Sequence, residues 1–95
     1  MQKKDSIKIH GIGTVTRRTG LTSHAIRAWE RRYEAVSPQR SDGNQRLYSD
    51  ADIHRLLLLK KATEEGMSIS KAVGLDEAAL QGFIRDERLT STEVP

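Results

Sequence analysis

The chain has 95 residues, no cysteine and a formal net charge of +3. This length suits one small domain, and the lack of cysteine excludes disulfides and thiolate metal sites. No apolar run approaches the roughly 18 residues of a spanning helix, and no apolar segment follows the N-terminal lysines. We therefore expect no membrane contact and no signal peptide, and we expect a cytoplasmic location.

The positive charge is concentrated in one half of the chain. Residues 1–48 hold ten Lys/Arg and four Asp/Glu, whereas residues 49–95 hold six and nine. A local excess of positive charge favours an anionic partner such as a phosphate backbone. Basic patches also occur on proteins that bind no nucleic acid, so this asymmetry favours DNA only modestly.

The N-terminal region predicts a strand and then a helix. Residues 1–6 are polar and expected to be disordered. Residues 7–10 (Ile-Lys-Ile-His) alternate, which indicates a short strand with both isoleucines facing inward. A first helix is expected from about Gly13 to Thr19, and Gly20 ends it because glycine tolerates the left-handed conformation found after helices.

A second helix is expected over Ser23–Tyr33. Thr22 or Ser23 supplies the N-cap, and Pro38 prevents continuation much beyond Glu34. Helical spacing separates a cationic side (His24, Arg27, Arg31) from an apolar side (Ile26, Trp29, Tyr33). We expect Trp29 and Tyr33 to pack on the core. Helix, glycine turn and helix form a helix-turn-helix, and this second helix has the features of a DNA-recognition helix.

A β-hairpin is expected next. Asp42-Gly43-Asn44 favours a turn because Gly and Asn accept positive φ, and extended residues flank it. Arg40 and Arg46 then lie on the two arms. Asn44 is assigned mainly to turn geometry. A hairpin directly after a helix-turn-helix is a wing.

Three further helices are expected. Ser49 and Asp52 approximate a capping box for a third helix that ends at Gly66. A short fourth helix follows within residues 67–74, and a C-terminal helix within 75–88 is capped by Asp76. Residues 89–95 are expected to be disordered. The inward-facing residues are Ile53, Leu56, Leu57 and Leu59, then Ile69, Ala72 and Val73, then Leu80, Phe83 and Ile84.

Three segments in order, Ile12–Thr22 (IGTVTRRTGLT), Ile26–Tyr33 (IRAWERRY) and Gly43–Ile53 (GNQRLYSDADI), resemble the MerR family of bacterial transcriptional regulators. The AWERRY form is similar to the branch with cobalamin-dependent, light-responsive repressors and curli regulators. The resemblance implies a mainly α, winged helix-turn-helix fold. We expect a four-helix domain with a hairpin wing over residues 7–74, followed by one short helix.

The resemblance also implies a function. The second helix lies in the major groove of double-stranded DNA, and wings contact flanking phosphates at promoters used by RNA polymerase. By position, His24 and Arg27 contact bases or phosphates, Thr14 and Thr22 contact phosphates at helix starts, and Arg40, Arg46 and Tyr48 contact phosphates from the wing. For Tyr48, packing of the ring in the core is an equally good alternative. Charge and exposure add Arg17, Arg18, Arg31 and Asn44 as further candidates.

The sequence departs from the family pattern in three places. Thr16 stands where a small alanine is usual. Glu34 stands where a glycine is usual, which costs about 1 kcal/mol if that position is left-handed. Only about twenty residues follow the fourth helix, so we expect this chain not to include the family's usual coiled coil and sensor domain. Two explanations remain open: a DNA-binding part of a longer regulator with a C-terminal sensor, such as a cobalamin-binding one, or a small protein that forms a homodimer through Leu80, Phe83 and Ile84.

Other functions are less consistent with these residues. His10, His24 and His54 are far apart, so no metal site is expected, and no cofactor is expected in this chain. No nucleophile–base pair or phosphate-binding glycine loop is visible, so an enzyme is not expected. The alternative is a protein-interaction or architectural module that offers the same basic surface to an acidic protein or a recombination complex.

Overall fold

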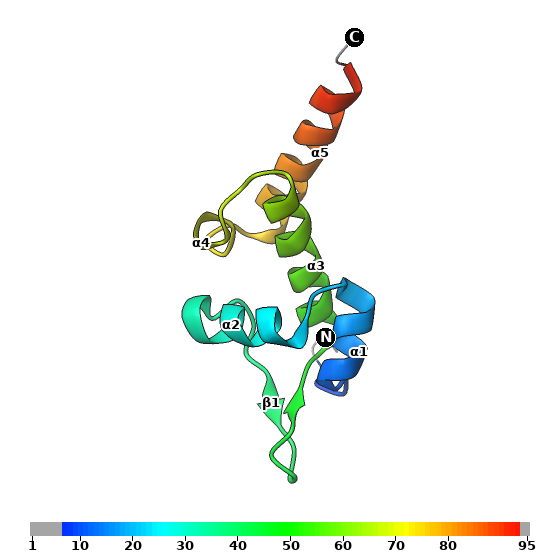
Figure 1. Ribbon diagram of the computed structural model, residues 1–95, viewed down its shortest axis with the longest axis vertical. Coiled ribbons are helices and arrows are strands. Elements are labelled where there is room, and N and C mark those ends of the chain that lie inside the picture. The colour runs from blue at the N-terminus through cyan, green and yellow to red at the C-terminus, as the bar shows by residue number, and fades with distance from the viewer. Residues whose placement is uncertain (1–6, 94–95) are drawn as a thin grey trace, which may run out of the picture. The chain divides into compact units, whose positions relative to one another are not determined.

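The structure is a computed structural model that describes the backbone of residues 7–93 and the side chains of residues 7–86. The expectation for residues 1–6 therefore lies outside the described residues. The chain divides into two compact units, Met1–Leu57 and Leu58–Pro95. The elements (Figure 1) are α1 (Ile12–Thr19), α2 (Ser23–Tyr33), β1 (Gln39–Arg40), β2 (Arg46–Leu47), α3 (Asp50–Glu64), α4 (Ile69–Ala72) and α5 (Glu77–Glu93).

The helix-turn-helix is confirmed, together with the local signals that predicted it. Gly20 ends α1 in the left-handed conformation (φ 78°), and its N–H donates to the Thr16 carbonyl at 2.8 Å. Thr22 caps α2, because its hydroxyl accepts from the Ala25 N–H at 3.0 Å. A short turn between a glycine C-cap and a threonine N-cap therefore sets the start of α2 relative to α1.

The end of α2 is left-handed at a residue that is not glycine. Glu34 has φ 51° and ψ 40°, and its N–H donates to the Glu30 carbonyl at 3.0 Å. The backbone thus has the conformation for which glycine is usual at this position. A side chain with a Cβ atom is strained there.

The expected hairpin is present, in antiparallel register with Gln39 opposite Leu47 and Arg40 opposite Arg46. The Asn44 N–H donates to the Ser41 carbonyl at 2.8 Å, and Asn44 has φ 64°. The residue with positive φ is therefore Asn44 and not Gly43, as in three-residue hairpin loops that end in one left-handed residue. We call residues 39–48 the wing; it extends away from α1 and α2 in Figure 1.

The first unit has one apolar core. Its buried residues are Val15, Ile26, Val36, Tyr48, Ile53 and Leu56, and Ile12, Leu21, Trp29 and Leu57 pack against them. The capping box at α3 is confirmed: the Ser49 hydroxyl accepts from the Asp52 N–H at 3.0 Å, and the Asp52 carboxylate accepts from the Ser49 N–H at 2.9 Å. This core holds α2 and the start of α3 around the wing's last residue.

The N-terminal segment alternates as expected, but in the opposite phase. Ile7 and Ile9 are exposed (47% and 63%), so the prediction that they face inward was wrong. Lys8 instead donates to the Asp52 carboxylate at 2.7 Å and to the Ser37 carbonyl at 3.0 Å. The carboxylates at the start of α3 provide partners for the polar side of this segment. The Ile9 and His10 N–H groups both donate to the Tyr48 carbonyl, at 3.0 Å and 2.9 Å, so the expected strand is reduced to an isolated antiparallel bridge between His10 and Tyr48.

The second unit contains the rest of α3, α4 and α5. Ser68 caps α4 and Asp76 caps α5, whose Ala79 N–H donates to the Asp76 carboxylate at 2.9 Å. Leu58, Leu59, Ala62, Ala72, Leu80 and Ile84 are buried. α5 continues to Glu93, so the expected end near residue 88 was too early, and only residues 94–95 of the expected tail lie outside the described residues. Among residues 7–93 no helix is both long and apolar enough to cross a bilayer.

Candidate nucleic-acid interface

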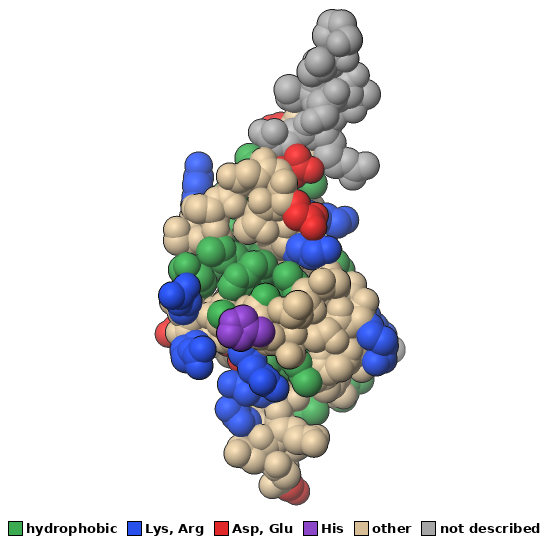
Figure 2. All heavy atoms as spheres, in the orientation of Figure 1, with side chains coloured by type: hydrophobic (Ala, Val, Ile, Leu, Met, Phe, Trp, Pro, Cys, Tyr) green, Lys and Arg blue, Asp and Glu red, His purple; other side chains and the backbone are tan. Residues whose placement is uncertain are grey.

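One side of α2 is cationic and exposed. His24, Arg27 and Arg31 are exposed, whereas Ile26 is fully buried, so the helix has the two faces that its spacing predicts. Figure 2 shows Lys and Arg side chains gathered over α2 and over the base of the wing. This side of the first unit therefore offers a concentrated set of guanidinium donors.

A cleft of about 480 Å³ joins α2 to the wing and to the start of α1. Its lining consists of Gly11, Ile12, Gly13, Arg27, Asn44, Gln45 and Arg46. Three of the expected site residues, Arg27, Asn44 and Arg46, are thus brought together although they are up to 19 positions apart in the chain. Arg27 is exposed, and it lies on the same side of the unit as the wing.

The wing holds its first arginine through the turn. The Arg40 Nη1 donates to the Asn44 carbonyl at 3.1 Å and to the Asn44 side-chain oxygen at 3.4 Å. Asn44 therefore serves the turn geometry and also orients Arg40. Both residues remain exposed, so their other polar atoms can reach a partner.

Glu30 links α2 to the second arm of the wing. Its carboxylate accepts from Arg46 Nε at 2.9 Å and from the Tyr48 hydroxyl. Burial, followed by the hydrogen bond to Glu30, raises the pKa of Tyr48 well above its usual value, so the phenol remains a donor. Sequence reasoning missed this role of Glu30; its position four residues after buried Ile26, on the packed side of α2, could have indicated it.

Tyr48 does not fit the role that the family resemblance implied. Its side chain is fully buried in the core, and its hydroxyl is bound to Glu30. A phosphate contact would require an exposed hydroxyl. We therefore correct that assignment and leave Tyr48 out of the proposed interface.

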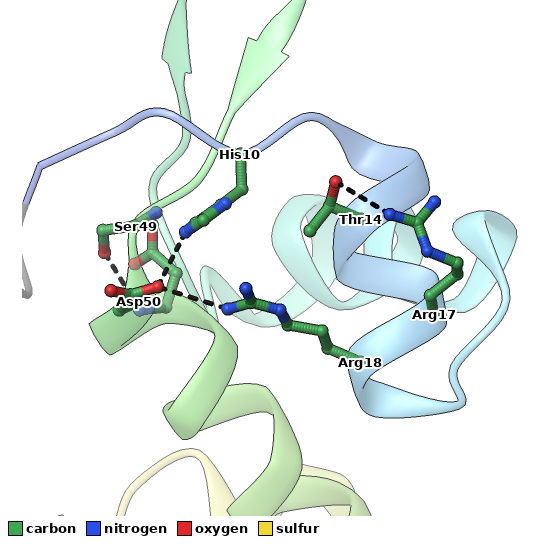
Figure 3. A network of polar contacts seen from close by, with 7 residues as sticks. His10, Thr14, Arg17, Arg18, Ser49 and Asp50 are labelled. Carbon is green, nitrogen blue, oxygen red and sulfur yellow. Dashed lines mark hydrogen bonds and ion pairs between the residues drawn. The ribbon is translucent and has the colours of Figure 1, made fainter.

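The candidates on α1 lie outside the cleft lining, and Figure 3 shows their contacts. Arg17 donates to the Thr14 hydroxyl at 3.5 Å. Arg18 and His10 both contact the Asp50 carboxylate, at 3.4 Å and 2.7 Å. Arg18 therefore ties α1 to the start of α3, whereas Thr14 and Arg17 form an exposed polar pair. Thr22 is exposed at the start of α2.

Comparison with known proteins places this geometry in a family. The model of the MerR HTH family regulatory proteins matches residues 11–79, which include the helix-turn-helix and the wing. The transcriptional regulator MlrA of Escherichia coli (strain K12) is 35% identical over 85 residues, which cover 86% of this chain and 35% of that protein. The chain thus spans about a third of that relative's length.

Solved structures share the fold. The N-terminal part of MtaN, the Bacillus subtilis multidrug transporter activator, is 25% identical, with a TM-score of 0.67 over 90% of this chain and 85% of that one. HiNmlR, a MerR family regulator lacking the sensor domain and bound to promoter DNA, is 18% identical, with a TM-score of 0.57 over 90% of this chain and 56% of that one. The family match, together with a recognition helix and wing on one cationic surface, shows that this chain belongs to the MerR family of transcriptional regulators and contains its winged helix-turn-helix DNA-binding domain.

Proposed function

We propose that this domain binds double-stranded DNA with α2 in the major groove and the wing on the adjacent backbone. The observation that carries the proposal is that Arg27 and Arg46 line one cleft, so that α2 and the wing present their cations to the same partner. A major groove admits one α-helix, and guanidinium groups bind both base edges and phosphates. An exposed cationic helix beside a cationic wing therefore suits a duplex.

Two kinds of contact follow from the positions of the residues. His24 and Arg27, with Arg31 one turn further along α2, are assigned to base edges. Thr14, Arg17, Thr22, Arg40, Asn44 and Arg46 are assigned to phosphates, which set the register and supply most of the affinity. Arg18 is peripheral because it is already paired with Asp50.

For the whole protein we propose a role in transcriptional control. It would act at a promoter, in contact with RNA polymerase, in the cytoplasm near the nucleoid. Pairing of two copies would let each domain read one half-site, and the two linked domains would bind more tightly than one. Pairing through Leu80, Phe83 and Ile84 has little support, because Leu80 and Ile84 are buried within one chain and Phe83 is half-buried.

Selection of bound fragments from a pool of random duplex DNA tests this function. We expect enrichment of a defined sequence, and a palindrome would give the half-site and its spacing together. Failure to retain any duplex at low salt, together with binding to an acidic protein, would overturn the proposal in favour of the protein-interaction module.

The Arg27→Ala variant tests the assignment of the recognition helix. We expect affinity for the selected duplex to fall by about 1–3 kcal/mol, with relaxed preference at one base position. Arg32→Ala is the matched control, because Arg32 is exposed on the same helix but lies outside the cleft lining and outside the proposed contacts. Fluorescence anisotropy titrations measure both; equal losses in the two variants would reduce Arg27 to a general charge effect.

A further inference from the structure

Glu30 is an acidic residue on the otherwise cationic helix that is proposed to bind DNA. It lies in the recognition helix, three residues after Arg27 and directly before Arg31, on a surface proposed to meet phosphates. A negative charge there repels DNA. The side chain is only 8% exposed and both of its oxygens are engaged by the wing.

The two contacts of Glu30 fix the wing in two respects. Arg46 and Tyr48 are two residues apart on one extended arm, so their side chains point to the same face of the hairpin. One carboxylate oxygen accepts from Arg46 and the other accepts from Tyr48. Because Glu30 binds both residues, it sets the position of this arm along α2 and also the orientation of the arm.

The pairing inside the wing creates a need for this carboxylate. Arg40 and Arg46 are direct cross-strand partners, and like charges directly opposite each other destabilise a hairpin. The Arg46 Nε is bonded to Glu30 at 2.9 Å, which offsets that repulsion. Among the described residues none bonds to the Nη atoms of Arg46, so they can still donate to a phosphate.

We infer that Glu30 is a positioning residue for DNA binding: it holds the wing in a fixed geometry against the recognition helix, so that Arg46 and Arg27 reach the same stretch of duplex. The inference rests on the proposed function. Its physical basis is that a mobile wing would lose entropy on binding DNA, whereas a wing already held by a buried carboxylate loses less. The residue acts through Arg46 and does not itself contact DNA.

If Glu30 acts only through its charge, removing that charge should strengthen DNA binding; if it positions the wing, removing it should weaken binding. Two isosteric variants test which effect occurs. Glu30→Gln and Glu34→Gln each remove one negative charge from α2 or its C-cap. Glu34 is exposed, and no described residue pairs with its carboxylate. The probe is a fluorescein-labelled duplex of mixed sequence spanning two helical turns, and the readout is its anisotropy at a temperature well below the melting point of every variant.

We expect Glu34→Gln to bind as tightly as the wild-type chain or more tightly, because it removes only a repulsive charge. Glu30→Gln is expected to bind about tenfold more weakly, despite the same change in charge, because the amide nitrogen that replaces one carboxylate oxygen is a donor and cannot accept from the wing donor at that position. In an Arg46→Gln background the Glu30→Gln effect on binding should shrink to about twofold or less. A residue that merely stabilised the fold would cost the same in both backgrounds.

Each other outcome has a defined meaning. If Glu30→Gln binds as tightly as Glu34→Gln, or if its loss is the same with and without Arg46, the inference is wrong while the proposed function stands. If the wild-type chain does not bind the duplex, the proposed function fails and the inference fails with it. If Glu30→Gln does not fold, Tyr48→Phe decides: it removes one of the two bonds without changing charge, and it should bind several-fold more weakly than Tyr33→Phe, whereas equal binding would overturn the inference.

Discussion

Glu34 ends α2 in the left-handed conformation, with φ 51° and ψ 40°, at a position where glycine would be strained least. The steric cost arises from the Cβ atom and the following carbonyl, so it does not depend on the charge of the side chain. A helix that carries the main candidate contacts therefore ends in a strained residue. Stability can be gained there without altering any residue assigned to DNA.

We expect Glu34→Gly to raise the free energy of unfolding by about 1 kcal/mol. Glu34→Ala keeps the Cβ atom and removes the carboxylate, so it should give little or none of this gain. Urea denaturation monitored by circular dichroism measures both variants. A gain of equal size in the alanine variant would assign the effect to charge and not to backbone strain.

Tyr48 gives the free energy of unfolding a dependence on alkaline pH. Its pKa in the folded chain is raised, first by burial and then by the Glu30 carboxylate, so the folded state keeps the proton at pH values where the unfolded phenol loses it. The stabilisation is complete below about pH 10, the unfolded value, and it is lost as pH rises above that. Tyr48→Phe should lack this loss. Urea denaturation of both proteins between neutral pH and about pH 11 tests the difference, and parallel curves would contradict it.

At the scale of elements, the wing is the part whose contribution to binding should be least dependent on DNA sequence. Arg40 is exposed on β1 and is oriented by Asn44, in a position suited to the backbone. We expect Arg40→Ala to weaken binding to all duplexes similarly and to reduce the slope of log K against log salt by about 0.9. Titrations at several salt concentrations, on the selected duplex and on an unrelated one, measure this. A loss confined to the selected sequence would contradict the phosphate assignment.

Elements defined by local signals could be predicted from the sequence, and those defined by distant partners could not. The cap of α2 at Thr22 or Ser23, Gly20 as the end of α1 and the Ser49–Asp52 box each depend on residues within four positions. All three are predicted from the sequence, and the structure selects Thr22 as the cap. The phase of the N-terminal segment depends on the carboxylate of Asp52, which lies 44 positions further along the chain and binds Lys8. Periodicity alone therefore could not show which side of this segment faces inward.

The candidate site shows the same division. The cationic side of α2 follows from helical spacing, and the exposure of Arg27 agrees with it. The burial of Tyr48 depends on how the wing's last residue packs in the core, and no local pattern specifies that. A tyrosine next to a basic strand fits a phosphate contact and a core position equally well, so sequence reasoning could not decide between the two.

At the scale of the whole chain, the uneven charge agrees with the separation into two units. The excess of Lys and Arg lies in residues 1–48, within the unit that contains α2 and the wing, and the acidic excess lies in residues 49–95. Lowering the ionic strength should therefore strengthen attraction to DNA mainly through the first unit. The second unit contributes buried apolar side chains, and the candidate contacts with DNA all lie outside it.

Leu80 tests whether the apolar residues of α5 serve one chain or a pair of chains. Its side chain is fully buried within the single chain. We therefore expect Leu80→Ala to lower the free energy of unfolding by about 2–5 kcal/mol, as for other core leucines, at every protein concentration. Phe83→Ala, at a half-buried position on the same helix, should cost less. Thermal melts over a hundredfold range of concentration, with analytical ultracentrifugation, measure both effects. A melting temperature that rises with concentration in the wild-type chain, and a dimer that Leu80→Ala dissociates, would instead assign this face of α5 to an interface between two copies.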